Sequence, residues 1–372
     1  MGKFNYDKEV LANLRLDEKD IPRLDRLIDY ESAKEAHEKK SHAAIDKRIS
    51  LKEAISEYVK DGDILTDGSF SYVRTPIIAF LEILRQGIKG MTNIGSPATN
   101  QSYLIPFGAI THSHWSYCGA EMRGTDRNMS RLVKEGKTKV VAEWSHGSMA
   151  LGFKAAQLGL PGVYSKQLLG SDILKYNPYV KVLTNPMKTE KDPCVYIPAL
   201  YPDVTIIHVH QADKFGNAKI YGPVINDAAM AAAARKVIIT AEEIIPPDAM
   251  RNDNKGVMIP FQYVDAVCEV PYGALLGSMP GLYYWPRRLW EKIMRYWAFK
   301  EGAIDEFYDL FVVQCKDQYD IIDKVLGGSK WMAMAKRLTK AEEFDNEDDG
   351  VDFHYEEWTM DAPDLNDIKD FK

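Results

Sequence analysis

Residues 206–222, IIHVHQADKFGNAKIYG, decide the fold because an apolar run with two histidines leads into a turn and then resumes. Side chains two apart on a β-strand share a face, so His208 and His210 point the same way, and His112 and His114 repeat the spacing. Such a pair can ligate a metal, but no third ligand follows at a recognisable spacing. We therefore expect no metal here, and predict a strand, a tight turn over 213–217 and a second strand.

Outward from this hairpin, strand and helix patterns alternate. Apolar runs predict strands at 64–66, 138–144, 237–240 and 264–270, and helical patterns lie at 77–87, 149–158 and 227–236. Ser50 and Glu53 have the spacing of a capping box, and Thr75 and Pro76 predict the N-cap and first residue of another helix. The alternation predicts an α/β fold, with a mainly parallel sheet flanked by helices on both faces.

The chain divides into four predicted segments. Residues 1–49 are a charged N-terminal helical arm, 50–285 the α/β domain, 286–340 a helical C-terminal region rich in aromatic residues, and 341–372 an acidic tail. The tail holds thirteen acidic residues against two lysines, whereas the whole chain of 372 residues has a net charge of −7, so the rest is mildly basic. Such a tail is typical of an extension that is either solvated or lies over the surface of a partner.

The composition narrows the class of protein. The four cysteines form no CxxC pair, which favours a reducing compartment over a disulfide framework. We find no signal peptide, no apolar run of membrane-spanning length and no basic patch with a helix-turn-helix pattern. The expectation is a cytoplasmic protein that binds neither membrane nor nucleic acid.

Several motifs together carry a resemblance to a known family. HVHQADKFGNAKIYG resembles the strand-turn-strand signature of class I coenzyme A (CoA) transferases, and is closest to the alpha subunits of the glutaconate CoA-transferases. GDILTDGSFSYVRTP, AAQLGLP, LLGSD, VIITAEEII and VDAVCEVPYGA follow in the expected order, over roughly residues 50–310. The resemblance implies the CoA-transferase alpha-subunit fold, shared with NagB and RpiA. It also implies a CoA thioester as substrate, with no permanently bound cofactor.

The resemblance also implies a covalent mechanism, in which a glutamate attacks the thioester and backbone amides of a glycine turn stabilise the oxyanion. Gly68, Ser69 and Phe70 match that turn, although the family has a second glycine where this chain has Ser69. The Ser69 hydroxyl either binds a substrate carboxylate or belongs to an ordinary turn. Arg74 either pairs with an acidic substrate or a CoA phosphate, or forms a surface salt bridge.

No Ser-Glu-Asn-Gly-like turn, which holds the nucleophile in the beta half of these enzymes, occurs in this chain. We therefore expect the catalytic glutamate to come from a separate beta subunit, in a hetero-oligomer of type (αβ)n. The transferase would move CoA between an acyl-CoA and a free carboxylic acid. Leu275 and Leu276 replace a His-Pro pair of the family, which puts glutaconate in doubt and admits a less polar acyl chain.

Two further places are candidate sites. Glu143 ends a predicted strand, where open α/β sheets place ligand-contacting residues, and is the alternative base if the protein is a CoA-thioester hydrolase or ring-cleaving enzyme. The acidic residue of such hydrolases falls on either Glu143 or His146. Gly170 and Ser171 predict an anion-binding turn. A second alternative is a non-catalytic ligand-binding protein.

Overall fold

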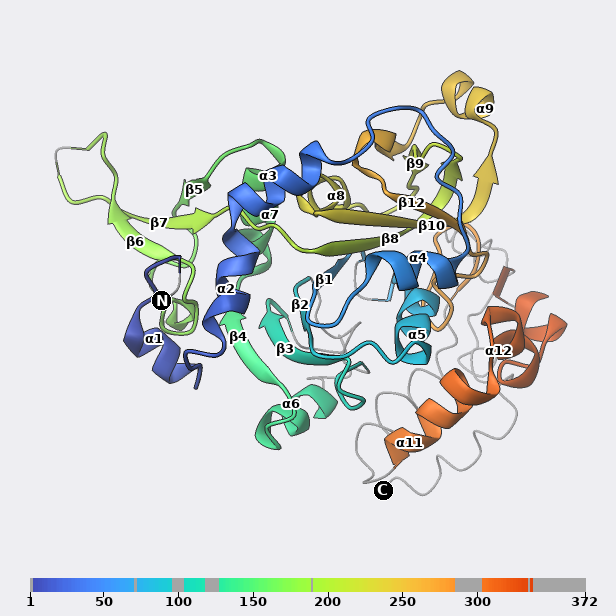
Figure 1. Cartoon of the computed structure of the whole chain (residues 1–372), viewed down its shortest axis with the longest axis horizontal. Coiled ribbons are helices and arrows are strands. Elements are labelled where there is room, and N and C mark those ends of the chain that lie inside the picture. Colours follow the sequence, from blue (N-terminus) through green and yellow to red (C-terminus); the bar gives the residue numbers. More distant parts are fainter. Residues whose placement is uncertain are drawn as a thin grey trace, which may run out of the picture.

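The computed structural model describes residues 3–69, 72–95, 104–117, 127–188, 190–284, 303–333 and 335–336. Phe70, residues 286–302 of the predicted C-terminal region and the tail at 341–372 lie outside these residues. The fold is α/β, as predicted (Figure 1). No helix in the described ranges is long and apolar enough to span a bilayer.

Within the described residues, nine strands form the main sheet, in the order β11-β9-β8-β1-β2-β3-β4, with β10 between β8 and β12. All pairings are parallel except those of β9 with β8 and β11. The carboxyl ends of the parallel strands therefore meet at one side of the sheet, which we call the carboxyl edge. The strands are β1 (Ile64–Asp67), β2 (Met91–Asn93), β3 (Ile110–Trp115), β4 (Lys139–Glu143), β8 (Val204–Asp213), β9 (Ala218–Lys219), β10 (Lys236–Ile245), β11 (Val257–Ile259) and β12 (Ala266–Glu269).

Helices cover both faces of this sheet because side chains alternate along each buried strand. Leu65 and Ile206 belong to a core with α4 (Leu51–Tyr58), α5 (Ile77–Arg85), α6 (Arg127–Lys134), α11 (Ala303–Tyr308), the π-helix Asp309–Gln314 and α12 (Gln318–Lys324). Ile64 and Ile94 belong to a second core with α1 (Lys8–Asn13), α2 (Ile21–Ile28), α7 (His146–Gln157) and α8 (Asp227–Ala233). We call the first side the α5 face. Helices α3 (Tyr30–Glu38) and α9 (Pro247–Asn252) complete the fold with the 3-10 turns Asp172–Lys175 and Phe261–Tyr263.

The hairpin that decides the fold is present as predicted, with a turn built around one side chain. The Asp213 carboxylate accepts hydrogen bonds from the amides of Phe215, Gly216 and Asn217. Gly216 has φ +107°, and a Cβ there would lie 2.8 Å from Val264. Only glycine fits this position because both the backbone angle and the close approach exclude a side chain.

Two predicted helix starts have different outcomes. The capping box of α4 is confirmed, since Ser50 and Glu53 bond each other's amides at 3.2 and 3.0 Å. The predicted N-cap Thr75 is wrong by one residue. Pro76 is the N-cap of α5, because its ψ of 59° is not helical and the first helical residue is Ile77.

The N-terminal segment, expected as an arm, lies against the α/β domain. Leu24 and Leu27 are fully buried, and the Arg26 guanidinium lies 2.7 Å from the Asp203 carboxylate. Arg235 donates to the backbone oxygens of Arg26 and Asp29 at 2.9 and 3.1 Å. These contacts fasten α2 and α3 to the loop before β8 and the start of β10.

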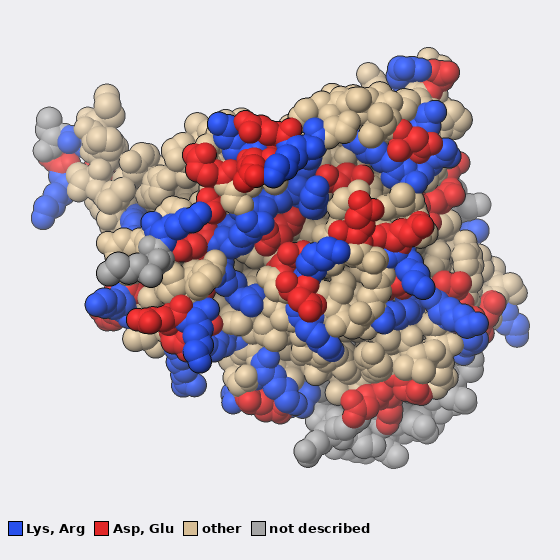
Figure 2. Space-filling view, viewed as in Figure 1, with Lys and Arg blue, Asp and Glu red and all other residues tan. Residues whose placement is uncertain are grey.

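A smaller antiparallel sheet, absent from the sequence prediction, has the order β5-β7-β6 and projects from the body (Figure 1). Its strands are β5 (Gly162–Ser165), β6 (Lys181–Thr184) and β7 (Pro193–Pro198). Figure 2 shows lysine and arginine mixed with acidic side chains over the face in view. The positive charge of the body is thus not gathered into one patch on that face.

Candidate functional site

The turn after β1 lies at the carboxyl edge, where the long strand β8 continues beyond β1. The Gly68 amide donates to Ile206 of β8 at 3.2 Å. A Cβ on Gly68 would lie 2.6 Å from Asp227 Oδ1 and 2.9 Å from Ile207 Cγ2, so the close approach of β8 and α8 requires glycine. The Gly68 amide is thus used within the sheet, and an oxyanion role for Gly68 and Ser69 stays a prediction.

The Ser69 side chain is buried and its hydroxyl donates to the Asp67 carboxylate. This contact matches the simpler of the two interpretations, a serine that closes its own turn. The third predicted residue of the turn, Phe70, is outside the described residues.

Arg74 has a different environment from the one predicted. Its side chain is fully buried, and its Nη1 lies 2.8 Å from Asp227 Oδ1. Its guanidinium also donates to the backbone oxygens of Gly68 and Pro223, at 3.1 and 2.7 Å. The prediction of a surface salt bridge is therefore wrong, because Arg74 binds the turn and α8 from inside, and a role in binding substrate stays a prediction.

The first histidine of the opening motif belongs to a buried network. His208 Nε2 donates to Glu242 Oε1 at 2.7 Å, and its Nδ1 lies 2.9 Å from Thr240 Oγ1. Glu242 also accepts from the Tyr283 hydroxyl at 2.6 Å and the Tyr272 amide at 2.7 Å. Burial alone raises the pKa of Glu242, but these three hydrogen bonds outweigh it and leave the pKa below its ordinary value. Glu242 is thus a fixed anion.

The second histidine is held from both sides. His210 Nδ1 accepts from the Tyr221 amide at 3.1 Å, and its Nε2 donates to the Pro280 oxygen at 2.8 Å. Burial lowers the pKa of His210 to about 4, so the ring is neutral with one tautomer fixed. Both histidines are strand residues bonded to neighbours, and the described residues contain no group of three or more potential metal ligands.

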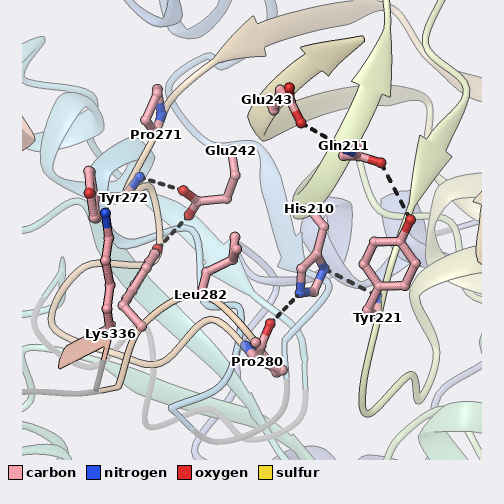
Figure 3. Close-up of a pocket in the computed structure, with 12 residues that line it drawn as sticks. His210, Gln211, Tyr221, Glu242, Glu243, Pro271, Tyr272, Pro280, Leu282 and Lys336 are labelled. Atoms are coloured by element: carbon pink, nitrogen blue, oxygen red, sulfur yellow. Dashed lines mark hydrogen bonds between the residues drawn. The ribbon is translucent and has the colours of Figure 1, made fainter. Parts of the chain in front are cut away.

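A pocket of about 480 Å³ opens beside these residues (Figure 3). Its walls come from the ends of β8 and β10 and from the loops after β12. They consist of His210, Gln211, Tyr221, Glu242, Glu243, Pro271, Tyr272, Pro280, Gly281, Leu282, Tyr283 and Lys336. The segment after the Gly68 turn runs beside the chain that precedes Pro280 of this wall, because the Arg74 amide donates to the Ser278 oxygen at 2.9 Å and the Ser278 amide to the Tyr72 oxygen at 2.7 Å.

Backbone strain is concentrated at the same place. Arg74, Tyr272 and Leu276 have φ of +61°, +61° and +80°, a region that bulky L-residues rarely adopt. Such strain persists only where the surroundings impose it, and it is common at functional sites. The geometry thus marks the pocket and the adjacent turn as one candidate site.

The other end of the carboxyl edge holds a second group of polar side chains, on the α5 face. Asn93 pairs with Ser113 in the β2–β3 ladder, and Trp115 with Glu143 in the β3–β4 ladder. Both side-chain atoms of Asn93 and Nε1 of Trp115 are buried without a hydrogen-bond partner. Native proteins leave few such groups unsatisfied, so they mark a place where a bound molecule can supply the partner.

Glu143 ends β4, as predicted, and is half-buried. Burial raises the pKa of its carboxyl group. Its backbone oxygen accepts from Asn177, while His146 begins α7 behind the Ser145 cap. Glu143 therefore keeps the features of a candidate base, three strand positions along the sheet from β1.

Gly170 and Ser171 lie in the loop that covers the end of β4, not at the turn after β1. The same loop lies against the start of α7, because a Cβ added to Gly147 would lie 2.6 Å from the Gln167 side chain. The Ser171 amide and hydroxyl both donate to the Leu168 oxygen, at 3.0 and 2.8 Å. The Ser171 amide is thus used within the loop, and an anion-binding role for this turn stays a prediction.

An α/β sheet with a glycine turn after its first strand and a pocket along its carboxyl edge is an architecture in which small-molecule ligands bind. Residues 48–270 match the model of the family described as "Coenzyme A transferase", and the chain belongs to that family.

Three relatives support this assignment. An uncharacterized protein of Archaeoglobus fulgidus is 37% identical, over 82% of this chain and 67% of its own length. One subunit of the 3-oxoadipate CoA-transferase of Pseudomonas knackmussii is 30% identical, over 70% of this chain and 92% of its own length. The crystal structure of glutaconate CoA-transferase from Acidaminococcus fermentans superposes with a TM-score of 0.73 at 29% identity, over 78% of this chain and 95% of that one.

The sequence prediction missed the network of Glu242 and the unsatisfied Asn93. The first had a partial signal, since His208 lies on a predicted strand and Glu242 two residues after the end of another, but which strands are neighbours was not predicted. Asn93 had none, because a short strand of three residues and a burial without partners are visible only in three dimensions.

Proposed function

We propose that the chain is the alpha subunit of a heteromeric CoA-transferase that moves CoA between an acyl-CoA and a free carboxylic acid. One observation carries this proposal: the described carboxylates beside the Gly68 turn are all engaged. Asp67 accepts from Ser69, Asp227 pairs with Arg74, and Glu242 accepts three hydrogen bonds. A carboxylate held by such contacts is a weak nucleophile, so we place the attacking glutamate on a separate beta subunit.

In this reaction the partner's glutamate attacks the thioester carbonyl and expels CoA as a thiolate, which leaves an acyl anhydride. The thiolate then attacks the glutamyl carbonyl, releases the first acid and forms a glutamyl-CoA thioester. The second acid enters by the reverse steps. Each attack creates a tetrahedral oxyanion, and we place its stabilisation at the turn after β1, because Arg74 and Asp227 fix this turn before substrate arrives.

The test is co-purification followed by an exchange assay. The full-length chain is isolated from its native cells, and its stoichiometric partner is identified by mass spectrometry. The complex should transfer CoA from an acyl-CoA to a labelled acid, whereas the chain alone should not. Transfer at the full rate by the chain alone would contradict the two-subunit proposal.

Glu143 supports a second candidate, the alpha subunit of a CoA-thioester hydrolase or ring-cleaving enzyme. The raised pKa of a half-buried carboxyl group is what a general base needs near neutral pH. Glu143→Gln separates the two reactions, with Glu135→Gln, on the exposed surface, as the matched control. If Glu143→Gln abolishes thioester hydrolysis while Glu135→Gln retains it, the hydrolase is favoured. If Glu143→Gln still transfers CoA, the transferase is favoured. A complex that binds acyl-CoA without either reaction would support a non-catalytic ligand-binding protein.

A further inference from the structure

The pocket lined by Tyr272 and Leu282 has polar groups that are almost all engaged with one another. His210 uses both ring nitrogens, and the Gln211 amide donates to Glu243 at 2.7 Å while its oxygen lies 3.4 Å from the Tyr221 hydroxyl. Figure 3 shows these dashed contacts along the wall, with the side chains turned toward each other. A ligand that enters this pocket therefore finds few free donors in the wall.

The charge of the pocket is unfavourable for an anion. Glu242 is anionic at its floor, Glu243 is exposed at its rim, and His210 is neutral. Among the described lining residues the one cation is Lys336, which is exposed and lies on the side of Tyr272, away from His210 (Figure 3). A solvated lysine at a rim is a weak partner, so a carboxylate inside the pocket would lose its hydration without compensation.

The remaining walls are apolar or aromatic. They consist of the rings of Tyr221, Tyr272 and Tyr283, the side chains of Pro271 and Pro280, and Leu282. Such walls gain free energy by removing hydrocarbon or a ring from water. The volume of about 480 Å³ is in the range of small-molecule sites and exceeds the needs of a two- or three-carbon acyl group.

We propose that this pocket holds the acyl chain of the substrate, and that it selects an uncharged aliphatic or aromatic monocarboxylic acid over a dicarboxylic acid. The inference rests on the proposed function, because the pocket becomes an acyl site only if the adjoining Gly68 turn holds the reacting thioester. The monocarboxylic acid proposed here differs from glutaconate and 3-oxoadipate, the acids in the names of two relatives, because both of those are dicarboxylates.

The experiment compares two probes of equal chain length, hexanoyl-pantetheine and adipyl-pantetheine, which differ by a terminal methyl or carboxylate. Binding to the purified full-length chain with its co-purified partner is measured by calorimetry. We expect the hexanoyl probe to bind at least about tenfold more tightly. Leu282→Trp, at a residue that is 39% exposed and therefore tolerant, should fill the pocket and weaken the hexanoyl probe by about tenfold or more, whereas Leu282→Met should change it by less than about twofold.

Lys336→Gln removes the one cation among the described lining residues, which is the feature that would favour a dicarboxylate. This variant should leave the preference for the hexanoyl probe unchanged. Equal or tighter binding of the adipyl probe, or no effect of Leu282→Trp, would overturn the inference whatever the reaction is. Transfer of CoA to hexanoate and adipate is assayed in parallel. Selective binding with no transfer to any acid would refute the proposed function alone, and efficient transfer to adipate would refute the selectivity alone.

Discussion

Replacement of Asp227 by Asn tests whether the buried ion pair with Arg74 holds the turn after β1. The two side chains are 2% and 0% exposed, and they meet through contacts of 2.8 and 3.2 Å. Asp227 Oδ2 also accepts from the Ile225 amide at 3.2 Å. Asn keeps the shape but removes the charge, and its NH₂ group must face a donor of either Arg74 or Ile225.

The expected loss in the free energy of unfolding follows from those contacts. A buried cation without its partner destabilises a protein by about 3–5 kcal/mol, which is a large share of a typical unfolding free energy of about 5–15 kcal/mol. The measurement is urea unfolding of the complex at fixed concentration, followed by circular dichroism. The double variant Arg74→Met with Asp227→Leu should recover much of the loss, since it leaves no buried charge. A loss below about 1 kcal/mol for Asp227→Asn would refute the role we give this pair.

Three further outcomes are expected. Gly68→Ala should cost about 1–3 kcal/mol and lower the transfer rate, because its Cβ would lie 2.6 Å from Asp227; unfolding and exchange assays that match the native protein would contradict this. Asn93→Leu should leave stability unchanged or raise it by about 1–2 kcal/mol, since two unsatisfied polar atoms disappear; a lower thermal midpoint would show that they have partners. The pKa of His210 falls from 6.5 to about 4 on folding, so the unfolded chain binds an extra proton in that interval. The contribution of His210 to stability should be complete above pH 6.5 and fall toward pH 4 by up to about 3 kcal/mol, and His210→Gln should remove that share of the slope in urea titrations.

The sequence predicted those parts of the fold in which local chemistry and strand pattern agree. The hairpin of β8 and β9 was predictable because Asp213 and Gly216 make its turn from their own side chain and backbone angle. The capping box at Ser50 is equally local. The small sheet of β5, β6 and β7 was not predicted, since β5 is only partly buried, β6 is mostly exposed, and both lack an alternating apolar pattern.

The candidate site was predictable only in part, because its residues come together through strand register. The Gly68 turn was found from its motif, but the partner of Arg74 lies 153 residues away, so a free substrate ligand and a buried ion pair could not be told apart. The Glu242 network likewise joins residues 34 and 41 positions apart. Parallel strands bring such residues side by side only after the intervening helices have packed.

The attachment of α2 to the body has a consequence for synthesis on the ribosome. Arg235 bonds to Arg26 and Asp29 across 209 and 206 residues of chain. At a translation rate of about 5–20 residues per second, these contacts of α2 form only on the order of 10–40 seconds after α2 is synthesised. During that time Leu24 and Leu27, which end fully buried, face solvent or a chaperone. An early-folding domain fused ahead of this segment would not shorten the wait, whereas slower translation of the region before Arg235 would lengthen it and increase aggregation.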